Sequence, residues 1–272
     1  MAGSQAAVVA EAAAGVGELG TCRPVDVGGR NRRPLKGAQR KWATSSRPTR
    51  LAMTHRSPAI ETSVPGVAFF EEALPGSLFE RLARAIRSVG RERIKRNYTT
   101  TFWLPLGQKP TNVAEEAALA LCDYAQPGSA CVGIEWWLGR LGPGQKLRYH
   151  FDRDMTLRKQ TGEYVHPIRA SVFYVNSFPS SPTVILDQVA GPDGESRVPE
   201  KPERRASIEA VANRYSVFPG QLRHGVIPVA DLAPPGEELR LSFLVNYWDR
   251  RPLPPLCFDY DGSIYPELRE VG

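Results

Sequence analysis

From residue 132 onward the chain is built of short segments rich in β-branched and aromatic residues, separated by Gly, Pro and Ser turns. The segments with this composition are 132–138, 145–151, 168–176, 183–188, 215–218, 222–228 and 239–248. They do not alternate with helical patterns, as the strands of a parallel α/β sheet would. The pattern therefore predicts an antiparallel β-sandwich or barrel.

Two helices are predicted ahead of this β-rich region. Between residues 78 and 89, apolar residues recur at helical spacing and arginines occupy the opposite side (Leu78, Leu82, Ile86 and Val89; Arg81, Arg84 and Arg87). Asn112 followed by Glu115 predicts a capping box for a second helix that runs through Cys122. The expected fold class is therefore mainly β with supporting helices.

The first 60 residues are rich in Ala and Gly, then in Arg, Ser, Thr and Pro, with little apolar periodicity. This composition predicts a disordered N-terminal extension over residues 1–60 and a folded domain over 61–272, with its β-core at about 130–250. The extension can also be translation from a start upstream of Met53, or an organellar transit segment. A secretory signal fits worst, because Glu11 interrupts the apolar stretch and no basic residue precedes it.

The formal charge of +6 is unevenly distributed along the chain. Residues 1–56 hold 10 basic and 3 acidic side chains, whereas the rest of the chain holds 25 basic and 26 acidic ones. A nearly neutral body does not indicate a nucleic-acid partner. No apolar run approaches the roughly 18 residues of a membrane-spanning helix, so a membrane location is not expected.

The cysteines are Cys22, Cys122, Cys131 and Cys257, and they form neither a CxxC pair nor a zinc-finger spacing. This usage is typical of a reduced intracellular protein. We therefore expect a cytoplasmic location, with an organellar one as the alternative if residues 1–60 act as a transit segment.

The segment at 145–151 ends in a histidine, and the spacing His150-x-Asp152 follows from it. In a strand, residues i and i+2 point to the same face and lie about 7 Å apart. Both side chains can therefore reach one metal ion. Chance alone also produces His-x-Asp pairs, and such a pair would then lie in a surface turn.

A second histidine, His224, lies in the apolar segment 222–228, where a returning strand can bring it against the first two residues. Two imidazoles and one carboxylate on one face of a metal ion are the ligand set of non-heme Fe(II) oxygenases. Taken alone, such a histidine would be a core residue. As the partner of the His-x-Asp pair, it becomes the third ligand.

Arg240 and Ser242 share a face of the last predicted strand. An arginine that points into a β-core needs a counter-charge, since an unpaired buried cation is very costly. A bound carboxylate would supply this charge with bidentate geometry. The alternatives are an outward arginine on an edge strand and an ion pair with an acid of the protein.

This order of His-x-Asp, distal His and Arg-x-Ser resembles the 2-oxoglutarate/Fe(II)-dependent dioxygenase superfamily, over about residues 130–250. Two stretches, 169–176 and 216–220, resemble its prolyl-hydroxylase-like branch in particular. The resemblance implies a double-stranded β-helix (jelly roll). It further implies that Fe(2+) is held by His150, Asp152 and His224, and that 2-oxoglutarate is held by Arg240, Ser242 and Tyr174. Ascorbate is a further reductant that the resemblance allows.

Three positions depart from the patterns of particular branches. Collagen-type prolyl hydroxylases usually have a lysine where Arg240 stands, and AlkB-type demethylases have a second arginine where Asn246 stands. The Gly-Gly-Glu-Thr of the prolyl branch is replaced here by residues 180–183, Ser-Ser-Pro-Thr. These departures put a collagen-like substrate in doubt and argue against nucleic-acid repair.

The resemblance implies a hydroxylase that uses O2 to oxidise an unactivated C–H bond of a small molecule or of a peptidyl side chain. No catalytic residue beyond the metal ligands is expected, because the iron and the cosubstrate carry the chemistry. Two other functions stay open from the residues alone. One is a non-oxidative, cupin-like jelly roll that binds Zn or Mn, and the other is a non-catalytic binding module.

Several neighbouring residues are expected to have structural roles. The charged stretch 190–206 predicts a long loop, and Asp154 and His166 are expected in a solvated loop and a surface turn. Trp136 and Trp137 must point to opposite faces of their strand, so only one of them can line a cavity.

Overall fold

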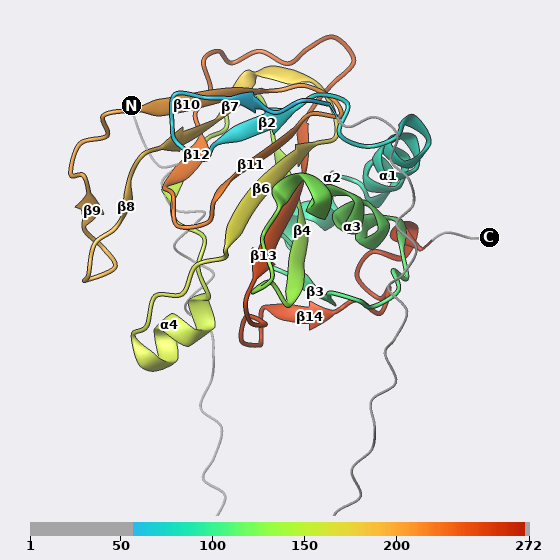
Figure 1. Cartoon of the computed structure of the whole chain (residues 1–272). Helices are drawn as coiled ribbons and strands as arrows, with labels where there is room; N and C mark the ends of the chain where they lie inside the picture. Colours follow the sequence, from blue (N-terminus) through green and yellow to red (C-terminus); the bar gives the residue numbers. More distant parts are fainter. Residues whose placement is uncertain (1–56, 270–272) are drawn as a thin grey trace, which may run out of the picture. The chain divides into compact units, whose positions relative to one another are not determined.

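The computed structural model describes residues 57–269, in which the strands form two principal sheets with helices beside them (Figure 1). The larger sheet has the order β1 (Ile60–Glu61), β2 (Ala68–Phe70), β11 (Tyr215–Pro219), β6 (Arg169–Tyr174), β13 (Arg240–Trp248), β4 (Gly133–Leu141), β3 (Thr101–Pro105) and β14 (Cys257–Asp259). The smaller sheet has the order β10 (Arg205–Ala210), β7 (Phe178–Leu186), β12 (His224–Val226) and β5 (Leu147–His150). Neighbouring strands are antiparallel, except for the parallel pair β14 and β3.

The order of the strands is that of a double-stranded β-helix. Strands β4, β5, β6 and β7 lie alternately in the larger and the smaller sheet, and β10, β11, β12 and β13 then alternate back. The second run inserts between strands of the first, so that β13 lies between β6 and β4, and β12 lies between β7 and β5. The jelly roll expected from the sequence is therefore confirmed.

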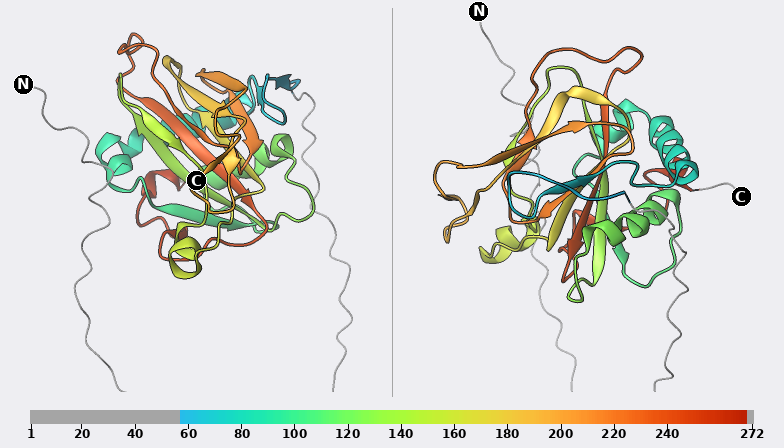
Figure 2. Two further views of the ribbon diagram at one scale, coloured as in Figure 1. Left: turned by 90° about the vertical axis from the view of Figure 1, so that its left-hand side faces the viewer. Right: turned by 45° about the horizontal axis from the view of Figure 1, so that its top comes forward.

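Five helical segments accompany the sheets: α1 (Gly76–Val89), α2 (Arg91–Arg96), α3 (Val113–Ala125), α4 (Met155–Thr161) and the 3-10 turn η2 (Pro266–Leu268). Helices α1 and α3 lie side by side on the same side of the larger sheet (Figure 2). Helix α3 begins at the expected capping box, where the Asn112 side chain accepts a hydrogen bond from the Glu115 backbone N–H. Each helix in residues 57–269 is too short or too polar to cross a bilayer.

The larger sheet has a buried core on each face, and strand β13 shows why. Its odd-numbered residues from Leu241 to Tyr247 pack in the cluster that contains the helices, together with Trp136 of β4. Its even-numbered residues begin with Arg240 and Ser242, which are both buried and lie on the face toward the smaller sheet. The alternation of a strand thus directs the polar residues of β13 into the interior of the sandwich.

The stretch 190–206 is more ordered in structure than a loop. It contains a paired arm, β8 (Val189–Ala190) and β9 (Arg197–Val198), which projects from the sheets (Figure 1), and its end begins β10. Helices α2 and α4 and strands β3 and β10 were not expected from the sequence. The proposed extension over residues 1–60 lies almost entirely outside the described residues, and it stays a prediction.

Candidate metal and cosubstrate site

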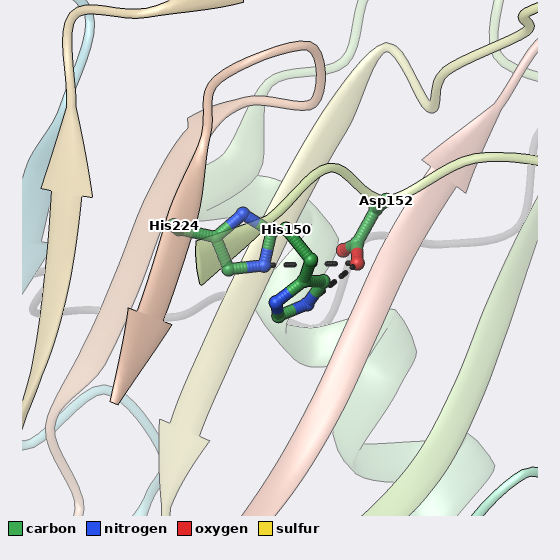
Figure 3. Close-up of side chains that lie close together, drawn as sticks. All are labelled: His150, Asp152 and His224. Carbon is green, nitrogen blue, oxygen red and sulfur yellow. Dashed lines mark ion pairs between the residues drawn. The ribbon is translucent and has the colours of Figure 1, made fainter. Parts of the chain in front are cut away.

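The structure brings His150, Asp152 and His224 together at one end of the smaller sheet (Figure 3). His150 is the last residue of β5 and His224 is the first of β12, and the two are paired directly across the antiparallel ladder. Asp152 follows β5 after one intervening residue. The backbone pairing therefore sets the distance between the histidines, with ring centroids 4.4 Å apart.

Both imidazoles are oriented by hydrogen bonds to the main chain. His150 Nδ1 lies 2.9 Å from the Arg148 carbonyl, and His224 Nδ1 lies 3.0 Å from the Leu222 carbonyl. A carbonyl can only accept, so each Nδ1 carries the proton and each Nε2 presents a lone pair. The two Nε2 atoms lie 3.5 and 3.6 Å from the same Oδ1 of Asp152. The three donor atoms converge as the ligands of one divalent cation would.

The protonation states of the three side chains also fit a metal ion. Burial lowers the pKa of His224 to about 4, which keeps that imidazole neutral near pH 7. Burial acts to raise the pKa of Asp152, but His224, His150 and the amide of Asn246 together bring it below its usual value. A neutral imidazole and an ionised carboxylate are the forms that bind a metal.

Asn246 of β13 supports the carboxylate from the larger sheet. Its Nδ2 donates a hydrogen bond to Asp152 Oδ2 at 3.0 Å, while Asp152 Oδ1 faces the histidines. We predict that Asn246→Leu will weaken Fe(II) or Mn(II) binding by about 10- to 100-fold, as loss of such supporting partners usually does. Metal titration would measure the effect. Unchanged affinity in a variant that unfolds at the wild-type temperature would contradict this role for Asn246.

A second polar cluster lies between the two sheets. Arg240 and Ser242 of β13, Tyr174 of β6 and Thr183 of β7 are all buried. Arg240 Nη1 donates to Ser242 Oγ at 2.6 Å, and Arg240 Nη2 donates to Thr183 Oγ1 at 2.8 Å. The Tyr174 hydroxyl also donates to Thr183 Oγ1, at 2.9 Å. The structure thus collects Arg240, Ser242 and Tyr174, the residues that the sequence pattern singled out, and adds Thr183.

The Arg240 guanidinium lacks an anionic partner within residues 57–269. It is only 3% exposed, its Nε has no hydrogen-bond partner, and its other contacts are neutral hydroxyls and the Tyr174 ring. β13 is an interior strand of its sheet, so Arg240 is not an outward residue on an edge. Burial lowers the pKa of Arg240, as expected for a cation without a counter-charge. An anionic ligand would complete this site.

Two hollows meet at the candidate metal site. The inner hollow extends between the sheets and is lined by Thr183, Arg240 and Ser242, among others. The outer hollow extends toward the loops and is lined by Glu135, Arg153 and other residues. Both hollows share the side chains Tyr98, Trp137, His150 and Asp152. The candidate metal site therefore separates a pocket that fits an anion from a second pocket near the surface.

Sequence reasoning missed Tyr98 and Glu135 in these hollows. Tyr98 follows α2, in a stretch for which no element was expected, and Glu135 is one acid within an apolar segment. The alternation along β4 could have found Glu135, because it must share a face with Trp137 and not with Trp136. Trp136 is in fact buried in the helix-side core, whereas Trp137 lines both hollows.

Two nearby residues differ from expectation. Asp154 is buried rather than solvated: its Oδ1 caps α4 by accepting from the backbone N–H groups of Thr156 and Leu157, and its Oδ2 accepts from Leu253 N. His166 is partly buried, with Nδ1 2.6 Å from the main-chain oxygen of Asp152. Both residues therefore hold the segment that carries Asp152.

Gly225 allows β12 to approach β5 closely beside the histidines. A Cβ at this position would lie 2.7 Å from the main-chain oxygen of Leu147, closer than packed atoms tolerate. We predict that Gly225→Ala will lower the free energy of unfolding by about 1–3 kcal/mol and weaken metal binding, because the strands must separate. Denaturant unfolding and metal titration would measure both effects. Gly76→Ala, where an added Cβ meets no atom within 4 Å, is the matched control and should change neither.

The fold and the convergent donors together define a double-stranded β-helix with a candidate site for one divalent metal ion. No model of a known protein family matches the chain, and a comparison with curated proteins finds no match either. Similar solved structures include a Pseudomonas putida prolyl-4-hydroxylase, with a TM-score of 0.41, 20% sequence identity and coverage of 68% of this chain and 89% of that chain.

Two further structures extend the comparison. One is the non-heme alpha ketoglutarate dependent epimerase SnoN from nogalamycin biosynthesis, with a TM-score of 0.41, 13% identity and coverage of 74% of this chain and 92% of that chain. The other is HygX from Streptomyces hygroscopicus with iron bound, with a TM-score of 0.42, 12% identity and coverage of 67% and 82%, respectively. The similarities agree with the resemblance seen in the sequence. The strand order and the side-chain geometry of this chain carry the interpretation of the site.

Proposed function

We propose that this protein is an Fe(II)- and 2-oxoglutarate-dependent oxygenase that hydroxylates an unactivated C–H bond. The observation that carries this proposal is the pairing of two features in one hollow. Three metal-donor atoms converge at one end, and a buried guanidinium without a counter-charge lies in the same hollow. A metal ion explains the first feature, and a dicarboxylate bound to it explains the second.

In this proposal His150, Asp152 and His224 hold Fe(II) through two Nε2 atoms and one carboxylate oxygen. Arg240, Ser242 and Tyr174 bind the distal carboxylate of 2-oxoglutarate, with Thr183 orienting the hydroxyl and guanidinium groups. Iron, 2-oxoglutarate and O2 supply the oxidising chemistry and release succinate and CO2, so the chain needs no acid–base residue of its own. The chain's contribution is to fix donor geometry, to orient the cosubstrate and to keep water out of the space between the sheets.

The two other functions considered from the sequence leave one observation without a purpose. A jelly roll that binds Zn or Mn for a non-oxidative reaction, or a binding module without a metal, would use the histidines or the fold. Neither would require a buried, unpaired arginine at 3% exposure facing the donor atoms. Retaining such a group is costly unless a ligand neutralises it. This comparison supports the oxygenase.

Anaerobic addition of Fe(II) and 2-oxoglutarate to the metal-free protein tests the proposal. A weak visible charge-transfer band is expected, followed by succinate when O2 is admitted. Mn(II) in place of Fe(II) is the matched control and should bind without forming succinate. If a folded, Fe(II)-loaded sample gives neither band nor succinate, the proposed function is wrong.

A further inference from the structure

The outer hollow contains two side chains of opposite charge that the proposed function does not use. Glu135 of β4 lines this hollow and lies on the same face of its strand as Trp137. Arg153 lines the same hollow and follows Asp152 directly. Neither of them forms an ion pair with any residue that the structure describes, although both lie beside the candidate metal site.

The other acids in the outer hollow already have partners. Asp152 faces the histidines and Asn246, and both carboxylate oxygens of Asp154 accept backbone N–H groups. Glu135 is different: its Oε2 accepts a hydrogen bond from the Trp248 indole at 2.9 Å, which orients the carboxylate but brings no positive charge. Burial raises the pKa of Glu135 to about 7, so a cation bound beside it would favour its ionised form.

Arg153 is the corresponding positive group. Its contacts are a hydrogen bond from Nη1 to the Gly194 carbonyl at 3.3 Å and stacking on the Tyr164 ring at 5.3 Å, and its buried Nε has no partner. These contacts hold the side chain in place without neutralising it. A planar guanidinium of this kind is suited to a carboxylate.

The remaining wall of the outer hollow offers apolar surface. Trp137 and Trp248 line it together with Leu253, and the partly exposed Met155 and Leu256 lie at the same hollow. Aromatic faces favour both carbon chains and ammonium groups. The hollow therefore combines an acid, a base and an apolar wall next to the three metal-donor residues.

We propose that the outer hollow is the substrate site and that it takes a small zwitterion with the chemistry of a free amino acid, whose ammonium pairs with Glu135 and whose carboxylate pairs with Arg153. The apolar wall receives its carbon skeleton and directs a C–H bond toward the metal. The proposal rests on the proposed function, because it names the substrate class of that same site. It also excludes a peptidyl side chain, in which the two charged groups are consumed in amide bonds.

Binding can be measured apart from turnover. The full chain is titrated without metal, and again with Mn(II) and 2-oxoglutarate, using calorimetry or the fluorescence of the tryptophans in the hollow. The probes are the L-amino acids and, for each that binds, the amine without its carboxylate and the acid without its amine (for leucine, isopentylamine and 4-methylpentanoate). At least one amino acid should bind about 10-fold or more tightly than both of its fragments, since each fragment leaves one charge unpaired.

Two substitutions assign the two charges. Glu135→Gln keeps an acceptor for the Trp248 indole, and it should weaken amino-acid binding by about 10-fold or more while leaving the acid fragment unaffected. Arg153→Gln should weaken amino-acid binding similarly and leave the amine fragment unaffected, and Arg153→Lys should restore part of the loss. The exposed residues Glu200 and Arg204 provide the matched controls Glu200→Gln and Arg204→Gln, which should change nothing.

The outcomes separate this proposal from the proposed function. If the band with Fe(II) and 2-oxoglutarate forms but no amino acid binds, or fragments bind as tightly as the amino acid, the zwitterion site is wrong and the oxygenase stands. If an amino acid binds as expected but the band is absent, the oxygenase is wrong and so is the role of the ligand as its substrate. Equal effects of the control substitutions would also overturn the assignment of Glu135 and Arg153.

Discussion

Alanine in place of His224 is expected to weaken Fe(II) binding by more than about 100-fold and to remove succinate formation in proportion. Loss of a supporting partner already reduces metal affinity by about 10- to 100-fold, and loss of a ligand itself must do more. Asp152→Ala should have the same effect, because its Oδ1 lies within 3.6 Å of both Nε2 atoms. Metal titration under anaerobic conditions and a succinate assay would measure the two effects.

The control for this prediction is the histidine outside the triad. His166→Asn removes an imidazole but keeps a side-chain N–H that can reach the Asp152 carbonyl. This variant should bind iron within about 10-fold of the wild type, below the range expected for a lost ligand. A folded His224→Ala or Asp152→Ala protein with full turnover would show that the ligands have been assigned incorrectly.

Replacement of Arg240 by methionine should move cosubstrate affinity and stability in opposite directions. Affinity for 2-oxoglutarate should fall by at least about 30-fold, because removing one member of a buried charge pair typically forfeits about 2–5 kcal/mol. The free energy of unfolding without ligand should stay unchanged or rise by up to about 4 kcal/mol, because an apolar side chain replaces a buried cation that has no counter-charge. Calorimetry with 2-oxoglutarate and denaturant unfolding would measure the two changes.

Two further variants make this result specific. Arg240→Lys keeps the charge but loses the planar fork, so it should retain more affinity than Arg240→Met and less than the wild type. Arg204→Met replaces an exposed arginine and should alter neither affinity nor stability. A marked loss of stability in Arg240→Met, with affinity for 2-oxoglutarate intact, would mean that Arg240 is a structural residue only.

The sequence predicts the jelly roll and the three converging side chains because both depend on simple periodicity. Strand alternation alone places His150 and Asp152 on one face, and Arg240 and Ser242 on another. The partner strands cannot be read in the same way. The pairing of β12 with β5, which sets the distance from His224 to His150, is a long-range contact that no local pattern specifies.

Other elements were missed although their signals were present. Strand β10 has the sequence Arg-Ala-Ser-Ile-Glu-Ala, which alternates between exposed and buried residues as a half-buried strand should, but the charges around it indicated a loop. Helix α4 begins after the capping Asp154 and ends at Gly162, the usual signals for a start and a stop. It lacks an apolar stripe, so the periodicity that identifies longer helices was absent.

The division between the inner and outer hollows has a consequence for how readily this protein can be adapted. The residues around Arg240 belong to strands of both sheets, so substitutions there disturb the scaffold, whereas much of the outer hollow comes from segments beyond the strand ends, such as 153–156 and 252–256. Directed evolution confined to those segments could exchange one acceptor molecule for another while the oxidant-generating half stays intact. Such a layout would let selectivity drift under selection without a matching loss of foldability.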